Sequence, residues 1–147
     1  MTDTIREYTL KKLRQKDFDC AKEYTLAMFS GKYKLLIICS LYHNGAMRFN
    51  ELQRLSEHAT HKMMTQQLKE MIKDGLISRH EQLISHRKAV FYQLTNTGKS
   101  LMPIIDAMCQ WGEKRLQDLK LDIEFCSDYS NSRCSILSSG CFKLLKH

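Results

Sequence analysis

The stretch that decides the fold is residues 48–95, which read RFNELQRLSEHATHKMMTQQLKEMIKDGLISRHEQLISHRKAVFYQLT. The apolar spacing predicts a short helix over residues 50–55 and, after a polar break, a longer helix over residues 60–73. Two β-prone runs follow, residues 76–80 and 89–94, with a basic polar turn between them. Two helices followed by a hairpin form the pattern of a winged helix-turn-helix. We therefore predict a mainly α fold that carries a small antiparallel β-wing.

Capping signals place the ends of both helices. Asn50 can cap the first helix, and Gln53 three residues later can complete a capping box. Thr60 can cap the second helix. That helix is expected to stop at Asp74–Gly75, because glycine readily adopts the left-handed conformation that ends helices. These boundaries agree with the apolar spacing.

The second helix has one apolar and one polar side. Met64, Leu68, Met71 and Ile72 recur at helical spacing and are expected to face the core. The side chains on the open side are rich in hydrogen-bond donors, the kind that contact phosphates and base edges in a major groove. Cations ahead of the first helix and near the wing tip are expected to join them. The full set of expected DNA contacts is Arg48, Thr60, His61, Lys62, Thr65, Gln66, Gln67, Lys69, Arg87 and Lys88. Without the surrounding pattern, these residues would indicate only a solvated surface.

Length and charge bound the function. The 147 residues carry a formal net charge of +7 and the pI is about 9.1, which favours a polyanionic partner. The chain contains no run of about 18 apolar residues, so the sequence does not predict a membrane span. Residues 1–16 lack the apolar core of a secretion signal. We therefore expect a cytoplasmic protein, whose thiols stay reduced. The sequence contains no Gly-rich phosphate loop, no nucleophile–base pair and no carboxylate cluster, so it does not predict an enzyme.

The cysteines give no metal signature. None of the six forms a C-x-x-C pair or has zinc-ligand spacing to a histidine. We therefore expect no metal site and no cofactor. Cys39 and Cys109 fall on apolar helical faces and are expected in the core.

The chain divides by pattern into four segments. Residues 1–19 are expected to form an N-terminal arm or short helix, and residues 20–95 the winged helix-turn-helix domain, in which two helices separated near Gly31 precede the motif. Residues 96–120 are expected to form a C-terminal dimerisation helix. Residues 121–147 are a Ser- and Cys-rich tail that we expect to lack ordered structure.

The C-terminal helix carries an apolar stripe that is wider than a small winged domain needs for its own core. We therefore assign the stripe to homodimerisation. Pro103 falls inside this helix and should kink it or mark a restart. The stripe residues are Leu101, Ile104, Ile105, Met108, Trp111 and Leu116.

Over residues 20–112 the chain resembles the HxlR family of bacterial transcriptional regulators, relatives of the MarR-type winged-helix proteins. Each motif alone is common, but their order and spacing are specific to that family. The chain departs from the family pattern at Ala21, where proline is usual, at Tyr33, where tryptophan is usual, and in the wing strand at residues 89–92. The matching motifs are Cys20, Gly31-Lys32-Tyr33 before Leu35-Leu36-Ile37-Ile38, Arg48-Phe49-Asn50-Glu51-Leu52, Met64-Thr65-Gln66-Gln67-Leu68-Lys69-Glu70-Met71, Asp74-Gly75-Leu76-Ile77, Tyr92-Gln93-Leu94-Thr95 with Gly98, and Trp111-Gly112.

The resemblance implies a homodimer, held by its N-terminal and C-terminal helices, that binds an inverted repeat in double-stranded DNA near a promoter. It also implies that in some members the cysteine equivalent to Cys20 senses oxidants or electrophiles. In this chain, peptide N–H groups at a helix start and the neighbouring Lys22 favour the reactive thiolate, whereas Asp19 disfavours it. The alternative for Cys20 is a small buried residue at the dimer seam.

These observations predict a dimeric, sequence-specific DNA-binding transcription regulator, more often a repressor than an activator. Its effector is either an oxidant acting at Cys20 or a small molecule. Trp111 with Tyr92 could line a ligand pocket, although core packing is the simpler role for both. The alternative function is a winged-helix protein–protein adaptor that does not touch DNA.

Overall fold

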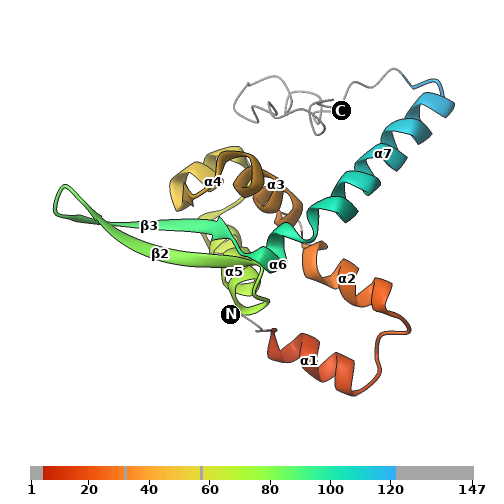
Figure 1. Ribbon diagram of the computed structural model, residues 1–147, viewed down its shortest axis with the longest axis horizontal. Coiled ribbons are helices and arrows are strands. Elements are labelled where there is room, and N and C mark those ends of the chain that lie inside the picture. The colour runs from red at the N-terminus through yellow and green to blue at the C-terminus, as the bar shows by residue number, and fades with distance from the viewer. Residues whose placement is uncertain (1–4, 32, 57, 122–147) are drawn as a thin grey trace. The chain divides into compact units, whose positions relative to one another are not determined.

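The structure is a computed structural model that describes residues 5–31, 33–56 and 58–121, and the chain divides into two compact units, residues 1–99 and 100–147. Helices and a three-stranded antiparallel sheet make up the first unit, and one long helix is described in the second (Figure 1). The predicted fold class, mainly helical with a small antiparallel wing, is confirmed. In chain order the elements are α1 (Glu7–Arg14), α2 (Ala21–Phe29), α3 (Lys34–Asn44), β1 (Met47–Arg48), α4 (Phe49–Leu55), α5 (His61–Lys73), β2 (Ile77–Ile84), β3 (Arg87–Leu94), α6 (Asn96–Lys99) and α7 (Met102–Asp118).

The buried side of α5 lies in the core of the first unit. Met64, Leu68 and Met71 are at most 2% exposed, as the apolar spacing predicted, whereas Ile72, the fourth predicted member of the stripe, is only half-buried. They share that core with fully buried side chains from α3, from α4 and from the first residue of β2 and the residue before it, namely Ile37, Ile38, Leu52, Ile77 and Leu76. Burial of this stripe fixes which side of α5 faces solvent.

The start of α5 is capped as predicted, and the start of α4 is not. Thr60 Oγ1 accepts a hydrogen bond from the Met63 backbone N–H at 3.1 Å. In α4 the N-cap is Arg48 rather than Asn50, and Glu51 Oε2 accepts a hydrogen bond from the Arg48 backbone N–H at 2.6 Å. The helix begins early because β1 ends at Arg48 and Phe49 is already helical. The reciprocal partner of the cap is therefore Glu51 and not Gln53.

The wing is longer and its turn tighter than predicted. Strands β2 and β3 pair antiparallel from Ile77 with Leu94 out to Ile84 with Arg87. Only Ser85 and His86 form the turn, with φ of 49° and 64°, the positive values that a two-residue hairpin turn requires. Arg87 and Lys88 therefore belong to β3. β1 adds a third, two-residue strand beside β3, which gives the sheet order β1-β3-β2.

The predicted helix over residues 96–120 is two helices. α6 ends at Lys99 in the first unit, and α7 starts at Met102 with Pro103 in its first turn, so the proline marks a restart. At Gly98 a side chain would collide with the carbonyl oxygen of Leu76, which explains the glycine. The predicted disordered tail lies, from residue 122 on, outside the described residues. None of the described helices is both long and apolar enough to cross a membrane.

Candidate nucleic-acid interface

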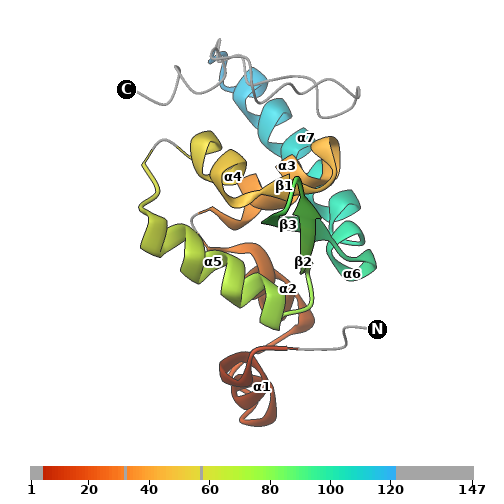
Figure 2. The ribbon, with the colours of Figure 1, turned by 90° about the vertical axis from the view of Figure 1, so that its left-hand side faces the viewer.

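The polar side of α5 is open to solvent along the helix. His61, Lys62, Gln66 and Lys69 are exposed, and Thr65 is half-buried. Figure 2 shows α5 after α4, with the sheet beside both helices. Thr60 is exposed as well, but its hydroxyl is already committed to the helix cap. The structure thus gathers most of the predicted α5 contacts on one face.

Gln67 does not share that face. It is half-buried, its side-chain oxygen is buried, and that oxygen occupies the space that a Cβ on Gly31 would need. Helical periodicity could have shown this, because position 67 lies beside the buried stripe of Met64, Leu68 and Met71 rather than opposite it. Gly31 therefore serves to admit the Gln67 side chain.

Several side chains on the open face are held by neighbours. Gln66 Nε2 donates a hydrogen bond to Glu70 Oε1 at 3.1 Å. The His61 ring packs against the Phe49 ring with 4.6 Å between centroids, and His61 Nδ1 lies 3.4 Å from Thr65 Oγ1. The Phe49–His61 contact joins the first residues of α4 and α5. These contacts restrict the rotamers of residues that would otherwise move freely, which lowers the entropy lost on binding.

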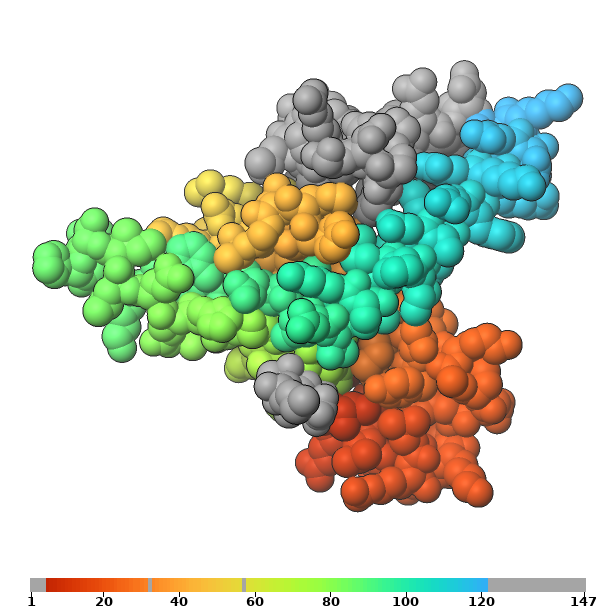
Figure 3. All heavy atoms as spheres, viewed as in Figure 1, coloured from red at the N-terminus to blue at the C-terminus, as the bar shows by residue number. Residues whose placement is uncertain are grey.

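The wing presents cations next to apolar side chains. Arg87 and Lys88 follow directly after the turn and are exposed. Opposite them, Leu83 pairs with Lys88 and Ile84 with Arg87, and Leu83 is 75% exposed. Figure 3 shows the β2–β3 hairpin standing out from the rest of the first unit. Both predicted wing residues are therefore open to an anionic partner.

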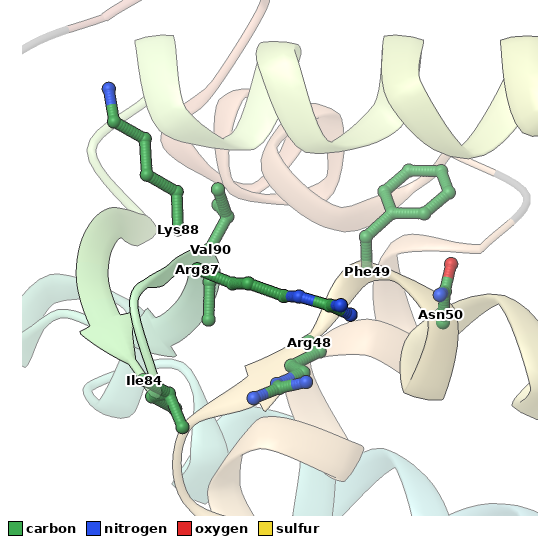
Figure 4. Close-up of a pocket in the computed structure, with 8 residues that line it drawn as sticks. Arg48, Phe49, Asn50, Ile84, Arg87, Lys88 and Val90 are labelled. Carbon is green, nitrogen blue, oxygen red and sulfur yellow. The ribbon is translucent and has the colours of Figure 1, made fainter.

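A cleft of about 390 Å³ separates the wing from the start of α4. In Figure 4, Arg87 extends across this cleft toward Phe49 and Asn50, and Arg48 approaches from the opposite wall. The Arg48 guanidinium also lies 5.2 Å from the centre of the Phe91 ring, a cation–π contact that restrains it. The residues that line the cleft are Arg48, Phe49, Asn50, Ile84, Arg87, Lys88, Ala89 and Val90.

The positive charge of this surface is not neutralised within the part of the chain that the structure describes. There, the cations in ion pairs are Arg6, Lys34 and Arg79. None of these three lines the cleft or belongs to the predicted contact set. The cations on α5, in the cleft and on the wing therefore remain available for an anionic partner.

Cys20 is the N-cap residue of α2 and is exposed in the single chain, with no side-chain hydrogen bond to the helix start. Cys39 is buried, as expected for a core residue. Cys109 is only half-buried, and its sulfur lies 3.7 Å from Glu113 Oε1. The other three cysteines, Cys126, Cys134 and Cys141, lie outside the described residues.

The predicted dimerisation stripe of α7 divides into two sides. Leu101 and Ile105 are buried, and Leu116 is half-buried. Ile104, Met108 and Trp111, spaced four and three residues apart on one side of the helix, are 42%, 45% and 71% exposed. The prediction that Trp111 packs in the core of a single chain is therefore wrong. Tyr92, by contrast, is buried.

Comparisons with known proteins agree with this geometry. A family model described as the HxlR-like helix-turn-helix matches residues 28–120. The HTH-type transcriptional regulator YdzF of Bacillus subtilis (strain 168) is 47% identical over 91 residues, which are 61% of this chain and 82% of that protein. The crystal structure of the HTH-type transcriptional regulator ytcD has a TM-score of 0.61 at 38% identity, covering 67% of this chain and 98% of that chain. The structure of the redox regulator HypR in its reduced form has a TM-score of 0.60 at 35% identity, covering 69% and 98%. The chain belongs to the HxlR-like helix-turn-helix family of transcriptional regulators.

Proposed function

We propose that this protein binds double-stranded operator DNA as a homodimer in the cytoplasm and represses transcription from an inverted repeat. The observation that carries the proposal is the open, donor-rich side of α5 beside a cleft lined by unpaired cations. Three cations around one cleft favour a polyanionic partner such as DNA. Occupation of an operator that overlaps a promoter would exclude the polymerase.

Helix α5 is the element that enters the major groove. Its Lys62 and Lys69 contact phosphates, and release of counterions from those phosphates supplies sequence-independent affinity. Gln66 contacts a base edge, where a bidentate pair with adenine is worth about 1–3 kcal/mol of discrimination. Because Gln67 is half-buried beside Gly31, we assign base contact to Gln66 alone of the two glutamines.

The cleft holds the sugar–phosphate backbone next to the groove. Two guanidinium groups, those of Arg48 and Arg87, face it from opposite walls, and guanidinium forks match phosphate oxygens. Lys88 and the exposed Leu83 extend the contact toward the minor groove. These contacts fix the position of the protein on DNA and carry no base information.

The homodimer forms through the exposed apolar side of α7, Ile104, Met108 and Trp111. Exposed apolar side chains of this size at helical spacing mark a protein contact. Two copies of α5 would then meet half-sites about 34–36 Å apart, one turn of DNA.

An electrophoretic mobility shift with the DNA upstream of the protein's own gene tests this function. We expect a specific shift for the parent and at least a tenfold weaker one for Lys62→Ala combined with Gln66→Ala, because a lost phosphate contact and a lost base contact add. The matched control is Lys11→Ala with Gln15→Ala, an exposed lysine and glutamine in and beside α1, which should bind like the parent. Equal, specific affinity of all three proteins would exclude Lys62 and Gln66 as the DNA contacts, whereas no specific shift with any of them would favour the adaptor function.

We further propose that oxidation of Cys20 releases the DNA. The exposure of Cys20 at the start of α2 supports this, as does the existence of both reduced and oxidised structures of the related redox regulator HypR. Hydrogen peroxide would take two electrons from the thiol and leave a sulfenic acid and water. Peroxide should therefore release the parent from DNA and spare Cys20→Ser. Equal release of both proteins would exclude Cys20 as the sensor and leave a small-molecule effector.

A further inference from the structure

A network of ion pairs joins the residue before α1 to the far end of α5. Arg6 Nη1 lies 3.1 Å from Glu70 Oε2, and Arg6 Nε lies 2.8 Å from Asp74 Oδ2. The Arg6 backbone N–H also donates a hydrogen bond to Asp74 Oδ1 at 3.0 Å. Arg6 thus contacts two carboxylates, one from Glu70 in α5 and one from Asp74, the C-cap residue of that helix. Its side chain contacts both carboxylates, and its main chain contacts that of Asp74.

Two further elements complete the network. Lys34 Nζ of α3 lies 2.9 Å from the same Glu70 Oε2, and Arg6 Nη2 donates a hydrogen bond to the Ala27 carbonyl of α2 at 3.3 Å. The side chains of Asp74 and Lys34 are 0% and 3% exposed, so water competes little for these contacts. Glu70 Oε2 is therefore held by cations from two different parts of the chain.

The other oxygen of the same carboxylate holds Gln66. Gln66 Nε2 donates to Glu70 Oε1 at 3.1 Å from one turn earlier in α5. This bond uses one of the two amide N–H groups of Gln66. The remaining N–H and the amide oxygen are the two groups that pair with N7 and N6 of adenine.

The charge state of Glu70 determines which way the Gln66 amide points. Burial alone would raise the pKa of Glu70, but hydrogen bonds from Lys34 and Gln66 and the charges of Lys34 and Arg6 outweigh it and lower that pKa below its usual value. An ionised carboxylate only accepts hydrogen bonds, so the amide must turn its NH₂ toward Glu70 and its oxygen away.

We propose that Arg6 is a positioning residue for DNA recognition, which fixes Glu70 and through it the orientation of Gln66 on the DNA-facing side of α5. The inference rests on the proposed function, because it requires that Gln66 contacts a base. It gives Arg6, which contacts the C-terminal end of α5, a part in sequence discrimination. A positioned amide loses less rotamer freedom on binding than a free one.

Selection of binding sites from a randomised DNA duplex library tests this, because it measures base preference separately from overall affinity. The full-length parent is compared with Gln66→Ala, Arg6→Gln, Glu70→Ala and the double variant Arg6→Gln with Gln66→Ala. Arg14→Gln, which removes an exposed α1 cation outside the described ion pairs, controls for lost charge.

We expect Gln66→Ala to lose the preference at one base pair in each half-site. Arg6→Gln and Glu70→Ala should weaken the preference at that same base pair by about 2- to 30-fold, the double variant should lose no more than Gln66→Ala, and Arg14→Gln should match the parent. Loss of Arg6 leaves the buried Asp74 unpaired, so thermal melting accompanies each selection. If Arg6→Gln does not melt cooperatively, Glu70→Ala decides, since its loss leaves the Arg6–Asp74 pair intact, and Glu70→Gln, whose amide oxygen can still accept from the buried Lys34, replaces it if it too fails to melt cooperatively.

Two outcomes would overturn the inference and leave the proposed function standing. In one, folded Arg6→Gln and Glu70→Ala keep the parent's full preference at the base pair that Gln66 reads. In the other, Gln66→Ala keeps every preference of the parent. If instead the parent enriches no sequence at all, the proposed function fails and the inference fails with it.

Discussion

Helices α5 and α7 each leave one long side open to solvent, and the two sides differ in chemistry. α5 exposes Lys62, Gln66 and Lys69, whereas α7 exposes Ile104, Met108 and Trp111. Exposure of polar side chains to water carries no free-energy penalty, so the open side of α5 does not by itself indicate a site. It is a candidate site because its cations are not paired with carboxylates among the described residues and because the wing lies beside it. Apolar side chains in water are unfavourable by about 25 cal/mol per Å². The open side of α7 therefore indicates a partner by itself, whereas that of α5 does not.

The largest expected effect is on the apolar side of α7. Met108→Glu combined with Trp111→Glu should raise the dimer dissociation constant about 100-fold or more, or about 3 kcal/mol, because two buried carboxylates would lack partners. Sedimentation equilibrium measures this, with Gln110→Glu, an exposed polar residue of the same helix, as the matched control. A parent that sediments as a monomer at tens of micromolar would contradict the assignment of α7.

The next effect separates the two kinds of contact within α5. Gln66→Ala should lower the affinity ratio between matched and mismatched sites by about 1–3 kcal/mol. Lys62→Ala should weaken binding to all sequences alike and reduce the slope of log affinity against log salt by about 0.9 for each half-site, or about 1.8 for the dimer. Fluorescence anisotropy titrations over a range of salt give both quantities. A Lys62→Ala variant with the parent's salt slope would show that Lys62 does not contact a phosphate.

A smaller effect concerns how the two helices begin. α5 has a side-chain cap from Thr60, whereas the N-cap residue of α7 is Leu101, whose side chain makes no capping hydrogen bond. Thr60→Ala should lower the free energy of unfolding by about 1 kcal/mol, while Thr60→Ser keeps the hydroxyl and most of the stability. Urea denaturation of the three proteins tests this, and equal midpoints for parent and Thr60→Ala would mean that the cap does not stabilise α5.

The smallest effect is a dependence of stability on acid that arises at Glu70 in α5. The pKa of Glu70 is lowered in the folded state, so its carboxylate stabilises the fold above the usual value of 4.5, and that contribution is lost as the pH falls through the folded pKa. The groups facing Glu70 are Arg6, Lys34 and Gln66, with Asp74 on the same Arg6. Glu70→Gln should therefore lower stability at pH 7 and narrow the gap to the parent below about pH 4.5. A gap that stays constant over this range would contradict the lowered pKa.

The parts of α5 that follow from local pattern could be predicted from the sequence. Its apolar side repeats at 3.6 residues and its cap is the common Thr type, and both predictions are confirmed. Gln67 was misplaced on the open side, although its position next to the stripe was available from the same periodicity. The start of α4 was missed because β1, only two residues long, leaves no pattern to read.

The remaining features of the fold and of the candidate site could not be predicted from local sequence patterns. They depend on contacts between residues far apart in the sequence, or on strands whose two faces are both exposed. Both strands of the wing are exposed toward the tip, so they show no alternation and their length could not be seen. Arg6 and Asp74 are 68 residues apart, and no local rule links them. In α7 the apolar residues surround more than one side, and only burial separates Ile105 from Ile104 and Met108.

Lysine acetylation footprinting with and without the selected DNA tests the central claim most directly, because it shows which cations the DNA covers. We expect DNA to slow acetylation of Lys62, Lys69 and Lys88 several-fold and to leave the exposed Lys22 and Lys114 unchanged. Full reactivity of Lys62 and Lys69 in the bound state would contradict the placement of α5 in the major groove.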